Sequence, residues 1–169
     1  MQANIPNISG EILNDKNLPK IIADKLKAKK QTLGLAESCT GGYIAHLITS
    51  LAGSSEYFKG GVVAYSNEMK SKILQVEEKV INQHGAVSKE VVEQMAKNLL
   101  HIADVDYGVA VSGIAGPGGG SDEKPVGTVW IAVADKNSVK AKCFSFDKNR
   151  KKVIKQAAAA ALYMLNQNI

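Results

Sequence analysis

The distribution of hydrophobic and polar residues along the chain predicts helices and strands in alternation. Apolar residues at helical spacing predict helices over residues 18–26, 40–53, 67–74, 88–103 and 151–165. Short apolar runs predict strands over residues 32–36, 61–65, 107–111, 126–134 and 139–146, the last two paired across the turn at 135–138. Because strands interleave with helices, we predict an α/β fold with a mixed, mostly parallel sheet covered by helices on both faces.

The sequence contains neither an internal repeat nor a clear linker, so we predict a single domain. Residues 1–13 carry no periodic pattern and are interpreted as an irregular lead-in, followed by a domain over residues 14–169. The lead-in would belong either to a complete short protein, which the initial Met favours, or to a linker cut from a longer protein.

The composition is that of a soluble globular protein. The 169 residues are 45% hydrophobic and 22% charged, which disfavours disorder. No apolar run approaches the roughly 18 residues of a membrane span, and the polar N-terminus lacks the apolar core of a signal peptide. The two cysteines, Cys39 and Cys143, form neither a disulfide framework nor a metal-ligand spacing, which favours the reducing cytoplasm.

The net charge of +5 is accompanied by two lysine-rich stretches, over residues 25–30 and 148–155. A nucleic-acid surface is one interpretation, but aromatic residues make up only 5% of the chain and none interleaves these stretches. We therefore favour solvated helix faces and expect no nucleic-acid partner. Arg150 is the only arginine in the chain, and its planar guanidinium is suited to binding a phosphate bidentately.

Three segments with unusual chemistry follow predicted strands, where α/β folds gather ligands. LGLAESCTGG at 33–42 brings serine, cysteine and threonine together, and is either a nucleophile site or a capped turn. YSNEMK at 65–70 follows the second strand. Seven of the 15 glycines fall within 108–127, which suits a phosphate or an oxyanion but does not match the phosphate-loop pattern of nucleotide triphosphatases.

A serine nucleophile needs a base, and the sequence offers histidine or lysine. Surface or capping roles suffice for His46, His84 and His101. A buried lysine becomes a base when burial lowers its pKa, and Lys70 is the attractive partner for Ser38. The S-x-x-K spacing of penicillin-binding enzymes is absent, so any lysine partner must come from elsewhere in the chain.

Four segments together carry a family resemblance. AESCTGG at 36–42, YFKGGVVAYSNEMK at 57–70, HGAVS at 84–88 and SGIAGPGGGSDEKPVGTVW at 112–130 resemble the competence/damage-inducible CinA C-terminal domain family, with similarity from about residue 14 to residue 165. That family includes bacterial nicotinamide mononucleotide deamidases. The resemblance implies hydrolysis of the substrate carboxamide to nicotinic acid mononucleotide and ammonia, without a metal or organic cofactor.

The resemblance also implies roles for individual residues. The catalytic serine falls on Ser38, and Tyr65 and Lys70 are the acid–base candidates. Either Lys70 alone takes the proton of Ser38, or Tyr65 does so in concert with Lys70. It assigns no chemistry to Cys39. Backbone N–H groups at the start of the Thr40 helix or in the 112–116 segment would stabilise the oxyanion. We expect the substrate contacts at Thr40, Gly41, Gly42, Asn67, Ser112, Gly113, Ala115, Gly116 and Arg150.

The segment FDKNRKKVIKQ departs from the family pattern. Lys148 and Asn149 replace a common glycine and aspartate, and Ile154 and Lys155 stand where further arginines are common. Lysine cannot reproduce the bidentate hydrogen bonds that arginine makes to a phosphate, so the pattern predicts weaker or differently arranged binding of the substrate phosphate. Many relatives also carry an N-terminal molybdopterin-binding-like domain, which is absent from these 169 residues, so its activity and metal are not carried over.

Two alternatives to the enzyme stay open at this point, a non-catalytic nucleotide-binding module and a competence- or DNA-damage-associated module. Whether the protein is an enzyme or a binding module, we expect a small-molecule nucleotide partner, no membrane partner and a symmetric homodimer.

Overall fold

The computed structural model describes residues 15–169, and the predicted lead-in over 1–13 lies outside them. Five strands form one sheet in the order β2-β1-β3-β4-β5. β1 pairs in parallel with β2 and with β3, whereas β3–β4 and β4–β5 are antiparallel. The strands are β1 (Leu33–Glu37), β2 (Phe58–Val63), β3 (Tyr107–Gly113), β4 (Thr128–Ala134) and β5 (Val139–Ser145). The mixed α/β fold is therefore confirmed.

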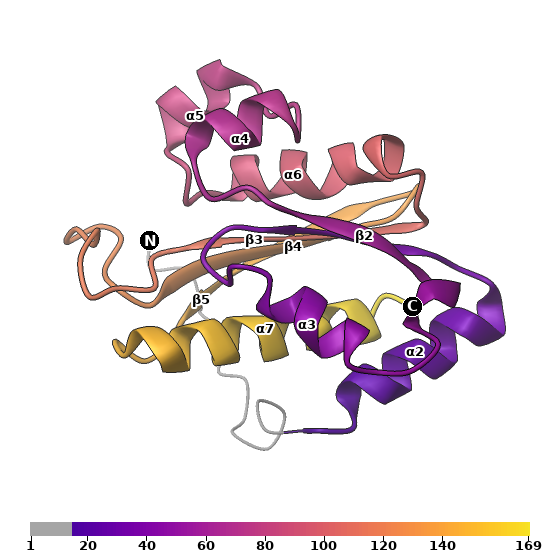
Figure 1. The fold of residues 1–169 in the computed structure, drawn as a ribbon. Helices are drawn as coiled ribbons and strands as arrows, with labels where there is room; N and C mark the ends of the chain where they lie inside the picture. The colour runs from indigo at the N-terminus through magenta and orange to yellow at the C-terminus, as the bar shows by residue number, and fades with distance from the viewer. Residues whose placement is uncertain (1–14) are drawn as a thin grey trace.

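Helices cover both faces of the sheet, as predicted, and each face has its own hydrophobic core (Figure 1). α2 (Leu18–Lys29), α3 (Tyr43–Thr49) and α7 (Arg150–Asn166) pack against one face around residues such as Ile22, Ile48 and Leu162. α4 (Asn67–Lys72), α5 (Glu78–His84) and α6 (Lys89–Ile102) cover the other face. A short 3-10 helix, η1 (Ser54–Glu56), precedes β2.

The helix α6 shows why the hydrophobic pattern succeeds. The Ser88 side chain accepts a hydrogen bond from the Val91 N–H and so caps the helix start. The apolar side chains at helical spacing, Val91, Val92, Met95, Ala96 and Leu99, are buried in the core on this side of the sheet. The antiparallel pairing of β4 with β5 across the 135–138 turn is likewise confirmed.

Boundaries differ from the predictions where glycine controls the backbone. The helix expected from residue 40 begins only at Tyr43, because Gly41 and Gly42 adopt φ values of 60° and 94°, which a right-handed helix does not allow. β2 spans Phe58–Val63 rather than 61–65, since Gly60 and Gly61 hide an edge strand from a pattern search. α5 was not predicted at all, and it ends at His84.

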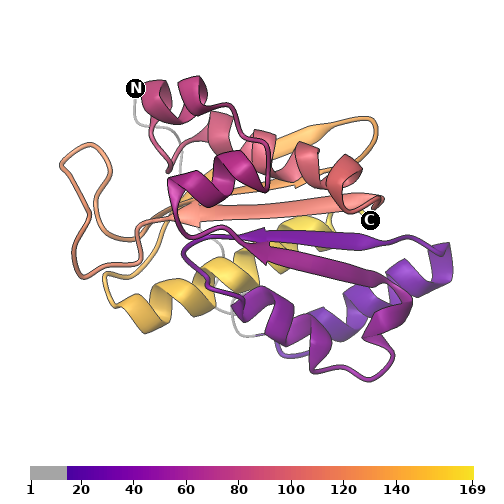
Figure 2. The same cartoon turned by 45° about the horizontal axis from the view of Figure 1, so that its top comes forward.

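The parallel strands β1, β2 and β3 end on the same side of the sheet, where the chain turns into α3, α4 and the glycine-rich loop (Figure 2). This loop projects beyond the sheet between β3 and β4, close to the start of α7. The three segments singled out by their chemistry therefore converge, as the fold class predicts.

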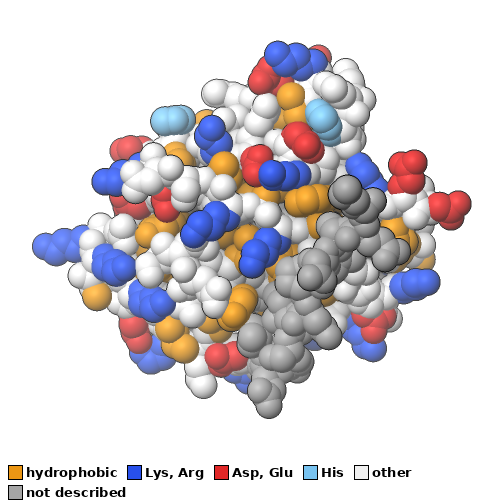
Figure 3. Space-filling view, turned by 180° about the vertical axis from the view of Figure 1, so that it is seen from behind, with side chains coloured by type: hydrophobic (Ala, Val, Ile, Leu, Met, Phe, Trp, Pro, Cys, Tyr) orange, Lys and Arg blue, Asp and Glu red, His pale blue; other side chains and the backbone are white. Residues whose placement is uncertain are grey.

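The described surface carries no single dominant charge patch in the view of Figure 3. Lysine and arginine side chains on that face are scattered among acidic and uncharged ones. None of the helices within residues 15–169 has both the length and the apolar character that crossing a bilayer requires.

Candidate active site

Ser38 and Lys70 meet at the carboxyl ends of two neighbouring parallel strands. Ser38 directly follows β1, and its N–H donates to the Val111 carbonyl of β3 at 3.0 Å, which fixes its backbone. Lys70 lies on α4, which follows β2 and is capped by the Ser66 side chain. The Lys70 Nζ lies 3.1 Å from the Ser38 Oγ and donates to the Ala64 carbonyl at 2.9 Å. The pair has the geometry of a nucleophile and its base.

The environment of Lys70 favours the neutral amine. The residue is 1% exposed, and Ser38 is 7% exposed. Burial lowers the pKa of Lys70 below its ordinary value of 10.5, because desolvation disfavours the charged ammonium, and the nearby Cys39 opposes this shift only in part. A neutral amine offers a lone pair to the serine proton, so burial prepares Lys70 to act as a base.

The thiol next to Ser38 is in the opposite situation. Burial raises the pKa of Cys39 to about 12, despite the opposing effects of its own backbone N–H and of Lys70. A thiol is nucleophilic as the thiolate, and Cys39 stays protonated near neutral pH. The family resemblance, which assigns no chemistry to the Cys39 side chain, is therefore consistent with the surroundings of this thiol.

A cavity of about 260 Å³ opens onto this pair. Of the predicted site residues, its wall contains Ser38, Tyr65, Asn67, Lys70, Ser112, Gly113, Ala115, Gly116 and Arg150. A larger cavity of about 380 Å³ lies between α2, α3 and α7, but its lining includes none of the predicted catalytic residues. Chemistry rather than size therefore identifies the candidate site.

Tyr65 and Arg150 form the outer part of the cavity. Arg150, the first residue of α7, donates through Nη1 to the Gly116 carbonyl at 2.8 Å and through Nη2 to the Tyr65 hydroxyl at 2.7 Å. Tyr65 is 57% exposed, and its hydroxyl contacts Arg150 rather than Ser38. The geometry thus separates the two predicted acid–base residues, with Lys70 at the nucleophile and Tyr65 at the rim.

Thr40, Gly41 and Gly42 do not line the cavity, in contrast to the contacts expected of them. They form the turn between Ser38 and α3, and the Gly41 N–H donates to the Ser38 carbonyl at 3.0 Å. The Gly42 N–H donates to the Glu37 carboxylate, so it is already occupied. The start of α3 is therefore not a free set of oxyanion donors.

Glu37 is the residue of this site that the sequence reasoning missed. Its carboxylate is 2% exposed and accepts three backbone hydrogen bonds, from Gly42 at 3.0 Å, Ile44 at 3.1 Å and Ala45 at 2.8 Å. It therefore caps α3 from the residue before the nucleophile. The only signal in the sequence was a charged residue at the end of an otherwise apolar strand.

Replacement of Glu37 by Gln is expected to reduce stability and activity together. The amide keeps one acceptor oxygen but presents an NH2 group to backbone donors, so we expect a loss of about 2 kcal/mol of unfolding free energy. Ser38 would lose its fixed position, and kcat should fall while KM stays nearly constant. Urea unfolding and steady-state kinetics measure both effects. The exposed Glu68→Gln on α4 is the control, with a change of about 0.5 kcal/mol or less.

The histidines take no part in this arrangement. His46 stacks with Tyr43 on α3, His101 is exposed at the end of α6, and His84 faces Glu90 with its Nδ1 3.7 Å from the carboxylate. None of the three lines the cavity. The wall instead includes Ala86 and Val87 from the turn after α5, which the sequence marked only through the HGAVS motif.

The fold and the site define a single-domain α/β protein with a buried serine–lysine pair at the ends of its parallel strands. The CinA C-terminal domain family model matches residues 15–169. The chain belongs to that family, and the resemblance stated from its motifs is confirmed.

Two curated relatives show the range of family architectures. The chain is 50% identical over 153 residues to the nicotinamide-nucleotide amidohydrolase PncC of Escherichia coli K12, covering 89% of this chain and 92% of that protein. It is 44% identical over 156 residues to a CinA-like protein of Amoebophilus asiaticus, covering 92% of this chain but only 38% of the relative. The second relative therefore contains a large part that has no counterpart here.

Solved structures share the whole fold. The CinA superfamily protein of Escherichia coli superimposes with a TM-score of 0.90 at 31% identity, covering 98% of this chain and 95% of that one. The competence damage-inducible protein A of Klebsiella pneumoniae gives a TM-score of 0.87 at 36% identity, covering 90% and 94%.

Proposed function

We propose that this protein is a nicotinamide-nucleotide amidohydrolase that converts nicotinamide mononucleotide to nicotinic acid mononucleotide and ammonia. The observation that carries the proposal is the buried Lys70 amine 3.1 Å from the Ser38 hydroxyl in a cavity. The 50% identity to PncC of Escherichia coli supports the choice of substrate. The activity would place the protein in pyridine nucleotide salvage.

The first half of the reaction is acyl transfer to the serine. The Lys70 amine accepts the Ser38 proton while the Ser38 oxygen attacks the carboxamide carbon, and the carbonyl oxygen becomes an oxyanion. Because Glu37 occupies the start of α3, we assign the oxyanion donors to the Cys39 N–H, which follows the nucleophile, and to the 112–116 segment. The Lys70 ammonium then protonates the leaving nitrogen, and the C–N bond breaks to release ammonia.

The second half regenerates the enzyme. Lys70, neutral again, takes a proton from water as the water oxygen attacks the nicotinoyl ester. The C–O bond to Ser38 breaks, the Lys70 ammonium returns the proton to the serine oxygen, and nicotinic acid mononucleotide leaves. One water is consumed and one ammonia released, so the same amine acts as base and acid in both halves.

Arg150 is our proposed anchor for the substrate phosphate. Its guanidinium lies at the cavity rim, held by the Gly116 carbonyl and the Tyr65 hydroxyl, and its charge is not neutralised by a carboxylate among the described ion pairs. The altered residues Lys148 and Asn149 precede it, and the Asn149 side chain caps α7 by accepting from the Lys152 N–H. The departure from the family pattern thus leaves Arg150 in position.

Arg150→Met is expected to raise KM for nicotinamide mononucleotide about 30-fold, since a bidentate charged contact is lost. The same change should alter kcat/KM for nicotinamide riboside, which has no phosphate, by less than about threefold. Ammonia release from both substrates measures the difference. Equal losses on the two substrates would assign Arg150 to supporting Tyr65 and Gly116 rather than to the phosphate.

Ammonia release from nicotinamide mononucleotide by the purified protein tests the proposed activity itself. We expect one nicotinic acid mononucleotide per ammonia. Binding of the nucleotide without turnover would establish the non-catalytic alternative, and salt-sensitive DNA binding without turnover would establish the DNA-associated one. On the face drawn in Figure 3 the lysines are scattered among acidic and uncharged side chains, so that face gives no support to the DNA-associated alternative.

We further propose that the protein acts in the cytoplasm as a homodimer without a metal or organic cofactor. Exposed apolar side chains on the edge strand β2, on α4 and directly after α4, namely Val63, Met69 and Ile73, support self-association. Sedimentation velocity of the purified protein measures the assembly state.

A further inference from the structure

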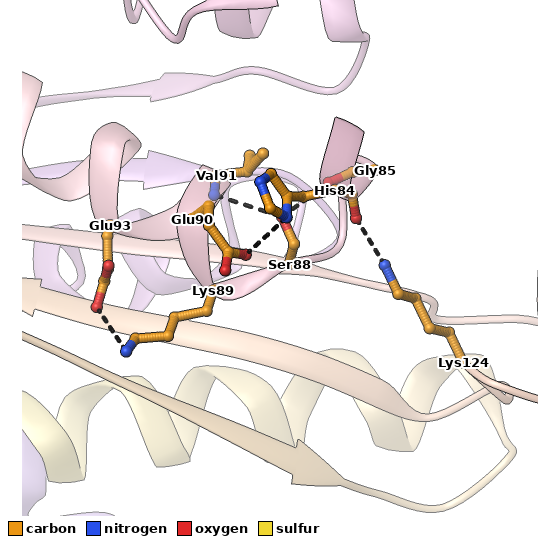
Figure 4. A network of polar contacts seen from close by, with 8 residues as sticks. All are labelled: His84, Gly85, Ser88, Lys89, Glu90, Val91, Glu93 and Lys124. Carbon is orange, nitrogen blue, oxygen red and sulfur yellow. Dashed lines mark hydrogen bonds and ion pairs between the residues drawn. The ribbon is translucent and has the colours of Figure 1, made fainter. Parts of the chain in front are cut away.

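Lys124 makes a long-range contact that the proposed reaction does not use. It lies on the loop between β3 and β4, and its Nζ donates to the His84 carbonyl at the end of α5 at 2.8 Å (Figure 4). Gly85 follows directly, with φ of 77°, and a Cβ there would lie 3.4 Å from the Lys124 Nζ. The lysine therefore rests against the α5–α6 turn at a place where a glycine leaves room for it.

The two segments that this contact joins both contribute residues to the cavity wall. Ala86 and Val87 belong to the α5–α6 turn, and Gly116, Gly118 and Gly119 belong to the loop. At the base of the loop, the Ser112 hydroxyl donates to the Ala86 carbonyl at 2.8 Å. The turn is thus tied to β3 by Ser112 and to the far side of the loop by Lys124.

The loop has few other restraints. Residues 117–123 are all exposed, and nothing lies within 4 Å of a Cβ built on Gly118. Among the described residues, two side-chain hydrogen bonds join 115–126 to elements outside the adjoining strands, one from Arg150 to the Gly116 carbonyl and one from Lys124. Within the loop, Ser121 and Lys124 bond each other through backbone N–H groups and so close a tight turn around the lysine.

The α5–α6 turn that accepts the Lys124 hydrogen bond is itself fixed by side-chain hydrogen bonds. The Ser88 hydroxyl donates to the Gly85 carbonyl at 2.8 Å and also caps α6 by accepting from the Val91 N–H at 3.4 Å. His84 faces Glu90 on the first turn of α6 (Figure 4). A glycine-rich loop anchored to such a turn loses much of its conformational freedom before the substrate arrives.

We propose that Lys124 is a positioning residue that holds the glycine-rich loop against the α5–α6 turn and thereby preorganises the substrate cavity. The kinetic consequence of this proposal rests on the proposed amidohydrolase function. The contact between Lys124 and the His84 carbonyl, which we call the tether, does not depend on that function. Because the lysine acts through the loop and not on the reacting atoms, its loss raises KM and leaves kcat nearly unchanged.

The test compares Lys124→Met with Lys136→Met, a matched change on the exposed β4–β5 turn. Amide hydrogen exchange of the free protein should accelerate over 114–127 and 84–88 in Lys124→Met only. KM for nicotinamide mononucleotide should rise about tenfold with kcat within about twofold, in line with the loss of one hydrogen bond from a charged donor. Lys124→Arg, which keeps a charged donor, should recover most of the affinity.

Each other outcome overturns part of the account. Faster exchange with unchanged KM would show that the tether does not shape the cavity. A raised KM with unchanged exchange would mean that Lys124 touches the substrate directly. If the wild type shows no deamidation, the proposed function fails, and the exchange result still decides whether the tether exists.

Discussion

Ser38→Ala is expected to lower kcat for deamidation of nicotinamide mononucleotide by about 10⁴-fold or more, because the variant lacks the oxygen that attacks the carboxamide carbon. Ser38 is only 7% exposed, and alanine fits the same space, so the fold should be retained. Ammonia release under saturating substrate measures the effect, and thermal unfolding verifies that the variant is folded.

Ser145→Ala, at the exposed end of β5, is the matched control and should keep wild-type kinetics. Substrate should still bind to Ser38→Ala, since the cavity wall and Arg150 remain. A Ser38→Ala protein with more than about one hundredth of wild-type kcat would remove Ser38 from the mechanism.

Lys70→Met is the second change with a large expected effect. Methionine matches the length of lysine but has no proton acceptor, so kcat should fall by about 10³-fold or more. Stability should be maintained, because a buried apolar side chain avoids the desolvation cost of an amine. Lys72→Met, on the exposed side of the same helix, is the control and should leave kcat unchanged.

The pH dependence of the wild type reports the same amine. Burial lowers the pKa of Lys70 from 10.5, and in the proposed mechanism the free base is the active form. As the pH falls through this lowered pKa, the amine is protonated and kcat declines; as the pH rises through it, kcat increases. A rate that falls with rising pH over this range would contradict the role of Lys70.

The pairing of Ser38 with Lys70, which the structure brings within 3.1 Å of each other, could be predicted because two levels of information agreed. Strand ends in α/β folds gather ligands, and Ser38 and Lys70 follow two neighbouring parallel strands. The family resemblance then selected these two residues among many serines and lysines. The predicted contacts at Ser112, Gly116 and Arg150 followed from the same reasoning, and all three residues line the cavity.

The rest depended on contacts that no local pattern encodes. Glu37 sits at the end of a buried strand, and its capping of α3 follows only once the turn at Gly41 and Gly42 is folded. The same turn contains Thr40, Gly41 and Gly42, which were predicted to contact the substrate but do not line the cavity. Lys124 bonds a carbonyl 40 positions earlier in the chain, so its partner is set by tertiary structure alone.

Hydroxylamine partitioning tests the central claim, an ester of the substrate on Ser38 formed with the help of Lys70, most directly. Hydroxylamine added to the wild-type reaction should divert part of the product into the hydroxamate of nicotinic acid mononucleotide. The hydroxamate fraction should rise to a plateau as the hydroxylamine concentration increases, and it should not depend on the substrate concentration. Neither product should form with Ser38→Ala. Ammonia release with nicotinic acid mononucleotide as the only product at every hydroxylamine concentration, or hydroxamate formation by Ser38→Ala, would contradict the account.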